Sequence, residues 1–300
     1  MSAKNDPRLT VGLIGLGNMG TAFAERLLDG GYDLLVYNRT AAKAEPLAAR
    51  GATVTDTAAK VAERVDVVLT SLPNDEAFES VAEEVVAALE PGRVLVDLST
   101  VSPGVSARVA GLADEAAVDY LRAPVSGNPT VVRSGNLSII VSGPRETLDR
   151  VEPILEAIGP TVQYVGAGEQ ARIVKLALNL MVAGLAQLMS EALVLAEASD
   201  VSRQDLLETM GSSAVGAPFV KYKTEPLLHD DYSATFTTAL MEKDIDLILE
   251  AAKHAGLELP VAQELKSLLR ATAEAGYADD DFMALYLRQR SASLDQEVVR

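Results

Sequence analysis

The stretch that decides the fold is TVGLIGLGNMG, residues 10–20. Its first part, residues 10–14, is mostly apolar and too short for a helix, so it predicts a buried β-strand. The glycine pattern G-x-G-x-x-G follows at once, and apolar residues at helical spacing then predict a helix over residues 18–28. A strand, a glycine-rich turn and a helix in this order are the context in which such glycines bind a dinucleotide.

The glycines of this loop have separate predicted tasks. Gly15 permits the tight turn, Gly17 lets a pyrophosphate approach the backbone, and Gly20 lets the helix pack closely on the strand. The N-terminus of the helix adds free N–H groups and the positive end of its dipole. The predicted cofactor-binding residues here are Gly15, Leu16, Gly17, Asn18, Met19 and Gly20.

The end of the next predicted strand, residues 33–37, indicates which dinucleotide binds. A carboxylate here would bond the ribose 2′-OH of NAD, but the sequence has Asn38, Arg39 and Thr40. A guanidinium pairs with a phosphate through two parallel hydrogen bonds, so these residues favour the 2′-phosphate of NADP(H). NAD(H) remains the alternative, with Arg39 then only a surface residue beside the next helix.

Strands and helices alternate as far as residue 165. Further strands are predicted over residues 66–72, 93–97, 118–121, 137–142 and 161–165, and helices over 41–50, 75–89 and 102–112. This alternation is typical of a doubly wound, mostly parallel sheet of the Rossmann type. We therefore expect a dinucleotide-binding domain over residues 1–165.

The pattern changes after residue 165. Residues 169–199 predict one helix about 45 Å long, and helices are then indicated over 202–210, 237–255, 260–275 and 280–287. No strand pattern occurs in this half. We expect an all-helical domain over residues 166–300, joined to the sheet by the long helix and used for substrate binding and dimerisation.

The composition excludes several kinds of chemistry. The chain of 300 residues has no Cys, which rules out disulfides, thiolate metal sites and a Cys nucleophile. Its two histidines, His229 and His254, are far apart in the sequence, so no metal site is predicted. A net charge of −17 argues against binding to nucleic acid or to an anionic membrane.

Targeting signals are not predicted. Residues 1–9 are polar, unlike a signal peptide, and the most apolar stretch, residues 176–195, contains Asn179, Gln187 and Glu191. We therefore expect a cytoplasmic enzyme without a membrane partner.

Two loops that follow predicted strands offer groups for the nicotinamide side of a cofactor. One contains Leu72 and Pro73, and the other contains Thr100. Ligands bind at such strand ends in sheets of this kind. Taken alone, each loop is equally well explained as a plain connection with helix-capping residues.

A third loop suits a small carboxylate. Ser126, Gly127 and Asn128 offer a hydroxyl, an accessible N–H and an amide. These three residues, with Thr100, are the predicted substrate-binding residues, and a purely structural turn is the alternative.

The residue with the clearest catalytic prediction is Lys175. It lies on the long helix among apolar residues, with Asn179 one turn further on the same face. A lysine in such surroundings needs a reason, which is either a chemical task or an aliphatic stem that carries the ammonium to water. We predict Lys175 as catalytic; the resemblance described next adds Asn179 to the catalytic residues.

Four motifs in this order make the chain resemble the β-hydroxyacid dehydrogenases: Gly-Leu-Gly-Asn-Met-Gly, Asp-Leu-Ser-Thr, Ala-Pro-Val-Ser-Gly and Lys175-x-x-x-Asn179. The resemblance runs from about residue 11 to 284. It implies that Lys175 transfers the proton, that Asn179 orients the substrate, and that Lys243 closes over the cofactor. It also implies dimers or tetramers.

The sequence departs from the family pattern at three positions. Arg122 replaces the usual Asp before Ala-Pro-Val, Asn128 replaces a Gly, and Ala77 occupies a usually polar position. The first two departures leave the substrate open, and Arg122 or Arg133 is a candidate for binding an additional anionic group.

The predicted function is hydride transfer between NADP(H) and a small β-hydroxy acid or aldehyde acid such as 3-hydroxyisobutyrate. An imine reductase shares the architecture, but its lysine position usually carries another residue. A non-catalytic cofactor-binding scaffold is the other alternative, and it would lack Lys175.

Overall fold

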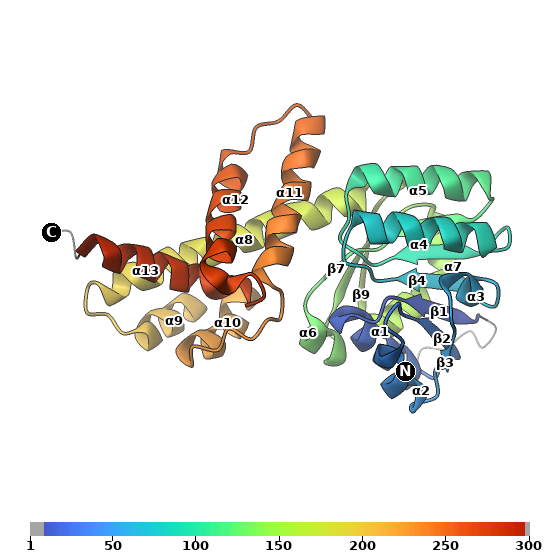
Figure 1. Ribbon diagram of the computed structural model, residues 1–300, viewed down its shortest axis with the longest axis horizontal. Helices are drawn as coiled ribbons and strands as arrows, with labels where there is room; N and C mark the ends of the chain where they lie inside the picture. The colour runs from blue at the N-terminus through green and yellow to red at the C-terminus, as the bar shows by residue number, and fades with distance from the viewer. Residues whose placement is uncertain (1–8, 298–300) are drawn as a thin grey trace. The chain divides into compact units, whose positions relative to one another are not determined.

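The computed structural model describes residues 9–297, with side chains as far as residue 292 (Figure 1). These residues form two compact units, the first ending at Lys175 and the second beginning at Leu176. The polar start predicted at residues 1–9 falls, apart from Leu9, outside the described residues.

The first unit is built on one sheet, which has nine strands within the described residues. Six of them follow the order β3-β2-β1-β4-β5-β6, and every neighbouring pair among these six is parallel. This is the order of a doubly wound dinucleotide-binding sheet, so the predicted fold class is confirmed. The strands are β1 (Val11–Ile14), β2 (Leu34–Tyr37), β3 (Thr53–Val54), β4 (Val67–Thr70), β5 (Val94–Asp97), β6 (Asp119–Arg122), β7 (Val125–Ser126), β8 (Ser138–Ser142) and β9 (Thr161–Gly166).

One edge of the sheet departs from parallel pairing. Strand β8 runs antiparallel to β6 and β7 and parallel to β9. The pairs of β6 and β7 with β8 lie in one register, interrupted by Ala123 and Pro124. Proline has no N–H for the ladder, which explains why the strand breaks here and why the sequence predicted a loop in place of β7.

Alternate residues of the central strands pack into two separate clusters on opposite faces of the sheet. For example, Leu34 and Val36 belong to one cluster and Leu35 to the other. Helices α1 (Asn18–Asp29) and α7 (Arg145–Ile158) contribute to the first cluster. Helices α3 (Ala58–Ala62), α4 (Asp75–Ala88) and α5 (Pro103–Glu115) contribute to the second, and α4 and α5 lie side by side in Figure 1.

Several of these helices differ from the sequence prediction. The predicted helix over residues 41–50 is instead a 3₁₀ turn, η1 (Ala41–Ala44), followed by the short α2 (Glu45–Ala48), because Pro46 lacks the N–H that a continuous helix needs. Helix α7 was not predicted, since Pro153 interrupts its apolar pattern. Helix α6 (Pro129–Arg133) was also missed, because a single helical turn leaves no periodicity to detect.

The predicted long helix is α8 (Gln170–Glu197). The sequence pattern changes near residue 165, whereas the compact units divide ten residues later, at Lys175. The first residues of α8 belong with the sheet because they are hydrogen-bonded to it, for example from Ala171 N to Ser142 Oγ over 3.1 Å.

Helix α8 is long and apolar enough to cross a membrane by length and composition, with 39% of its apolar window buried. One such helix is weak evidence, since the core helix of a soluble protein passes the same test. Its polar residues have partners in the second unit: Asn179 bonds Asp244, and Gln187 bonds Gln289.

The second unit is helical throughout its described residues. Besides α8 it contains α9 (Arg203–Ser212), α10 (Pro218–Leu228), α11 (Thr238–His254), α12 (Pro260–Thr272), the turns η2 (Ala273–Tyr277) and η3 (Phe282–Ala284), and α13 (Leu285–Glu297). Its core joins Ala186 and Met189 of α8 to Ile245 of α11 and Leu269 of α12. Helix α10 was not predicted, because Pro226 lies inside it.

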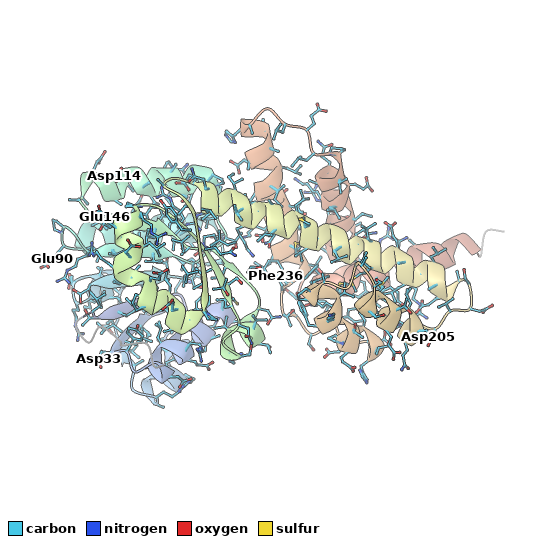
Figure 2. The ribbon with its side chains drawn as sticks, turned by 180° about the vertical axis from the view of Figure 1, so that it is seen from behind. Asp33, Glu90, Asp114, Glu146, Asp205 and Phe236 are labelled. Atoms are coloured by element: carbon cyan, nitrogen blue, oxygen red, sulfur yellow. The ribbon has the colours of Figure 1, made fainter. Side chains whose placement is uncertain are left out.

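Acidic side chains account for the negative charge and lie on the surface of both units. Figure 2 labels five exposed ones: Asp33, Glu90, Asp114, Glu146 and Asp205. A surface of this sign repels nucleic-acid phosphates.

Candidate active site

The glycine loop has the geometry that its predicted tasks require. Gly15 has a φ of +96°, and a Cβ on it would lie 2.2 Å from the carbonyl oxygen of Ser71. A Cβ on Gly20 would lie 1.9 Å from the carbonyl oxygen of Gly15. A Cβ on Gly17 would meet no described atom within 4 Å. Gly15 and Gly20 are therefore required by the protein's own backbone, whereas Gly17 leaves space beside the loop.

The loop lies where the direction of winding of the sheet reverses, between β1 and β4. Helix α1 begins here, its N-cap is Gly17, and no described side chain caps it. The neighbouring helices differ: Asn74 accepts from Ala77 N at the start of α4, and Ser102 accepts from Val105 N at the start of α5. Of these three N-termini, only that of α1 leaves its N–H groups for a phosphate.

Asn38 and Arg39, which follow β2, have different roles. Asn38 Oδ1 accepts from Leu16 N over 2.9 Å, and its Nδ2 donates to the Thr40 carbonyl over 3.0 Å. Asn38 therefore stabilises the glycine loop through its side chain, a role that the sequence did not reveal. Arg39 is exposed and has no ion pair or hydrogen bond to the described residues.

The loops after β4 and β5 are bonded to each other. Asp97 Oδ1 accepts from Thr70 Oγ1 and from Ser99 Oγ, each over 2.6 Å. Ser99 Oγ in turn accepts from Leu72 N over 2.8 Å. The structure thus brings together the two loops predicted for the nicotinamide side, with Leu72 and Thr100 half-buried and Pro73 exposed.

Arg172 completes this arrangement, and the sequence analysis missed it. Its guanidinium donates to Asp97 Oδ2 over 2.6 Å, to the Ser99 carbonyl over 2.7 Å and to Tyr120 Oη over 2.9 Å. Burial alone would lower the pKa of Arg172, but Tyr120 and Asp97 beside it raise that pKa overall, so the guanidinium stays charged. Burial also raises the pKa of Tyr120, which keeps its hydroxyl protonated. The missed signal was a second basic residue one turn before Lys175.

The predicted substrate loop is a tight turn. Ser126 ends β7, and Gly127 has a φ of +145°. A Cβ on Gly127 would lie 2.8 Å from Leu137 Cδ1, so the close approach also requires glycine. Asn128 caps α6, since its Oδ1 accepts from Val131 N over 3.0 Å. At least one of the polar atoms of Asn128 therefore serves the fold.

The idea that Arg122 or Arg133 binds an additional anionic group is not supported. Arg122 is buried, and its Nε and Nη2 both donate to Glu169 Oε1, over 2.8 and 2.5 Å. Arg133 pairs with Glu25 over 2.8 Å. Arg122 is thus paired inside the protein, whereas Arg133 is half exposed and shares the Glu25 carboxylate with Arg50.

Lys175 is the last residue of the first unit, and its side chain is half-buried. Asn179 and Lys243 belong to the second unit, where both contact the fully buried Asp244. Asn179 Nδ2 donates to Asp244 Oδ2 over 2.5 Å, and Lys243 Nζ lies 3.0 Å from Asp244 Oδ1. Asp244 was missed, although it directly follows Lys243 in the sequence.

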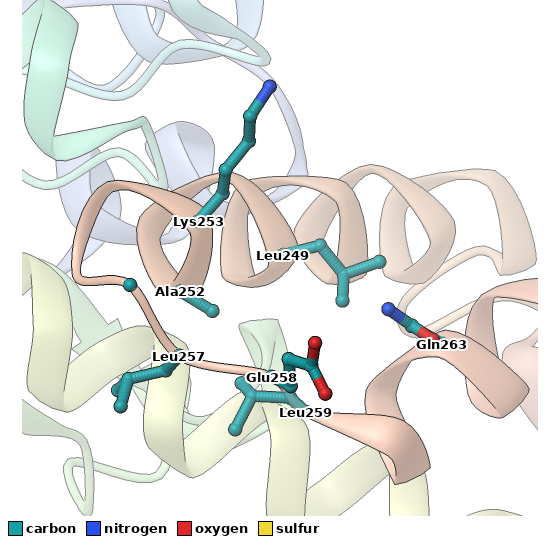
Figure 3. Close-up of a pocket in the computed structure, with 8 residues that line it drawn as sticks. Leu249, Ala252, Lys253, Leu257, Glu258, Leu259 and Gln263 are labelled. Carbon is teal, nitrogen blue, oxygen red and sulfur yellow. The ribbon is translucent and has the colours of Figure 1, made fainter.

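A separate pocket of about 440 Å³ lies at the turn between α11 and α12 (Figure 3). Leu249, Ala252 and Leu259 line it, while the Lys253 side chain points away. It contains none of the predicted site residues.

Comparison with known families agrees with this geometry. Residues 10–166 match the family model described as the NAD binding domain of 6-phosphogluconate dehydrogenase. Residues 166–288 match the model described as NAD-binding of NADP-dependent 3-hydroxyisobutyrate dehydrogenase.

Individual proteins match over nearly the whole chain. The 2-(hydroxymethyl)glutarate dehydrogenase of Eubacterium barkeri is 30% identical, over 92% of this chain and 93% of its own length. The structure of Mycobacterium tuberculosis 3-hydroxyisobutyrate dehydrogenase with L-serine has a TM-score of 0.85 at 29% identity, covering 94% of this chain and 99% of that one. The imine reductase of Myxococcus stipitatus has a TM-score of 0.62 at 23% identity, covering 92% and 98%, and shows the shared fold alone.

The fold, the glycine loop and the relatives together identify the chain as an NAD(P)-dependent oxidoreductase that acts on hydroxyl groups of hydroxy acids. More narrowly, the chain belongs to the β-hydroxyacid dehydrogenase family.

Two glycine variants should separate cofactor binding from folding. Gly17→Ala should fold with an unchanged Tm but bind NADPH about 30-fold more weakly, because its methyl group occupies the approach of the pyrophosphate. Gly20→Ala should lose about 1–3 kcal/mol of stability, because its methyl group meets the Gly15 carbonyl. Thermal unfolding without cofactor and fluorescence titration with NADPH measure the two effects.

Gly111→Ala is the matched control, since this glycine lies in α5 and its Cβ would meet nothing within 4 Å. It should leave the NADPH affinity unchanged and should not lower the Tm, because alanine is the better helix former. Wild-type NADPH affinity in Gly17→Ala would contradict the assignment of the loop.

Proposed function

We propose that this protein interconverts a small β-hydroxy acid, similar to 3-hydroxyisobutyrate, and the corresponding aldehyde acid, with NADP(H) as its preferred cofactor. The observation that carries the proposal is the position of Lys175. It is half-buried, and it lies one turn after Arg172, which donates to the Ser99 carbonyl in the loop after β5. Ser99 in turn accepts from Leu72 N in the loop after β4. Those loops border the site where ligands bind in such sheets.

In the proposed mechanism, Lys175 hydrogen-bonds the carbonyl oxygen of the substrate and donates a proton as negative charge develops there. In the oxidative direction it accepts the hydroxyl proton. The nicotinamide, when bound, supplies or accepts the hydride. Asn179, held by Asp244, orients the substrate, while Ser126, Gly127, Asn128 and Thr100 are the proposed contacts of its carboxylate.

The substrate class is supported by what the relatives act on or were solved with. The Eubacterium barkeri relative is named for a hydroxymethyl diacid, and the Mycobacterium tuberculosis structure holds L-serine. Both compounds carry a hydroxyl group on the carbon β to a carboxylate. The internal pairing of Arg122 with Glu169 favours a substrate with one carboxylate over one with a second anionic group.

The preference for NADP(H) is supported by the charges after β2. Arg39 is exposed and has no ion pair or hydrogen bond to the part of the chain that the structure describes, and Lys43 is exposed a few residues further on. No carboxylate follows β2 directly where one would select the ribose hydroxyl of NAD. The glycine loop and α1, from Gly15 to Gly20, would hold the pyrophosphate, and Lys243 is the lysine that the family resemblance assigns to the cofactor.

We also propose a homodimer or homotetramer in the cytoplasm, without nucleic-acid or membrane partners. The support is an apolar stripe on α8, formed by residues at coiled-coil spacing. Its members and their exposed fractions are Leu178 37%, Met181 72%, Leu188 64% and Leu195 71%.

Lys175→Met should lower kcat by about 10²–10⁴-fold, because the proton donor is lost while the aliphatic volume is kept. The Kd for NADPH should change by less than about threefold. Steady-state kinetics with 2-methyl-3-oxopropanoate and fluorescence titration measure the two effects. Lys221→Met, at an exposed position on α10, is the control. Normal turnover by folded Lys175→Met would remove this residue from the mechanism.

A panel of β-hydroxy acids and cyclic imines, assayed with both cofactors, tests substrate class and cofactor preference. We expect turnover of β-hydroxy acids and a lower KM for NADP⁺ than for NAD⁺. Arg39→Ala should raise the KM for NADP⁺ by about 30-fold and leave that for NAD⁺ nearly unchanged, because only NADP⁺ carries the phosphate. Turnover of imines alone would overturn the proposed substrate class.

Met181→Asp combined with Leu188→Asp should convert the assembly to monomers, because two charges on the stripe would be desolvated on association. Light scattering after sizing chromatography should give two or four times 31.7 kDa for the native chain and 31.7 kDa for the variant. A native protein of 31.7 kDa would contradict the proposed assembly.

A further inference from the structure

A buried ion pair lies beneath the two loops at the ends of β4 and β5, and the proposed mechanism gives it no task. The side chain of Arg172 is 1% exposed and that of Asp97 is 0% exposed. Four of the hydrogen bonds that the Arg172 guanidinium donates run to Asp97, Ser99, Ser106 and Tyr120. The first turn of α8 is thereby bonded to the end of β5 and to the loop after it.

Of these four hydrogen bonds, the one from Arg172 to the Ser99 carbonyl is the most informative. The Ser99 carbonyl belongs to the same peptide group as the nitrogen of Thr100, so Arg172 Nη1, at 2.7 Å, fixes how that peptide is oriented. On its other side, Ser99 Oγ accepts from Leu72 N and donates to Asp97. One guanidinium–carboxylate pair therefore sets the positions of both loops.

Arg172 also controls the position of Lys175. The two residues lie three apart on α8, which is one turn and about 4.5 Å along the helix axis. A side chain that fixes this turn to the sheet also fixes the distance between the turn and the Thr100 loop.

We propose that Arg172 is a positioning residue for the reaction: its guanidinium holds the Ser99–Thr100 peptide in a fixed place relative to the helical turn that carries Lys175. This rests on the function proposed above for Thr100 and Lys175. A planar guanidinium can donate to several acceptors at once, whereas the compact ammonium of a lysine cannot span the same set. Buried ion pairs are poor stabilisers compared with apolar packing, so geometry is the better reason for placing one here.

A second ion pair, at the start of α8, serves as a matched control. Arg122, at the end of β6, pairs with Glu169, which directly precedes α8. This pair also fixes the start of α8 to the sheet, but it has no hydrogen bond to Ser99 or Leu72. Arg122 stacks on the Tyr120 ring, 4.4 Å from its centroid, but makes no bond to the two loops, so removing the pair should disturb the start of the helix more than the loops.

The test compares Arg172→Lys with the double variant Arg122→Met/Glu169→Gln in the full-length chain. Arg172→Lys should lower kcat by about 30-fold or more, while KM for the substrate and Kd for NADPH change by less than about threefold. The control should keep kcat within about threefold. Hydrogen exchange of the chain without cofactor should be about tenfold faster in residues 98–101 and 71–73 of Arg172→Lys, and unchanged there in the control.

Equal losses of kcat in the two variants, or wild-type kcat in folded Arg172→Lys, would overturn the proposal. If Arg172→Lys does not fold, Tyr120→Phe decides, since it removes one of the acceptors that hold the Arg172 guanidinium and leaves the Ser99 hydroxyl in place. A loss of about fivefold in its kcat supports the positioning role, and a loss below about twofold overturns it. If the native chain turns over no β-hydroxy acid, the proposed function fails, yet hydrogen exchange still decides whether Arg172 holds the loops.

Discussion

The carboxylate of Asp97 is the constraint on which the first unit depends. It ends β5, is fully buried, and would be costly without partners. Thr70, Ser99 and Arg172 provide those partners, and each belongs to a different segment around the carboxyl ends of the strands. Satisfying one buried charge therefore aligns the end of β4, the loop after β5 and the start of α8. The segments that carry Leu72, Thr100 and Lys175 are brought together by this requirement.

The second unit contains a similar arrangement on a smaller scale. Asp244 is buried between Asn179 on α8 and Lys243 on its own helix. An amide alone would leave a buried carboxylate poorly compensated, and the lysine supplies the missing charge. Each compact unit thus uses one buried aspartate to fix residues that the family resemblance assigns to the reaction.

Much of the fold could be predicted because local patterns and long-range packing agree. Residues 10–20 alone indicated the strand, the turn and the helix, and the strands from β1 to β6 were found within a few residues, apart from β3. What could not be predicted were elements without a clear period, such as α7 with its internal Pro153, and pairing partners such as β8 for β7. Strand pairing depends on residues far apart in sequence, so local spacing does not reveal it.

The candidate site shows the same division. Glycine tasks were readable because a missing side chain has few explanations, and the structure agrees at Gly15, Gly17 and Gly20. Charged residues were harder to interpret, since Arg122 looked like a substrate contact until its partner Glu169 was located 47 residues away. The sequence shows a charge but not whether another residue neutralises it.

The pair formed by Arg122 and Glu169 also limits how the substrate loop can be exchanged between relatives. A graft of residues 122–129 from a protein with an aspartate before Ala-Pro-Val would set two carboxylates against each other, with Glu169 left uncompensated. Glu169 is half-buried, so its unpaired charge would cost less than the ~3–5 kcal/mol of a fully buried one, which is still a marked part of the stability of a domain. A chimeric protein that exchanges this loop must therefore exchange residue 169 as well.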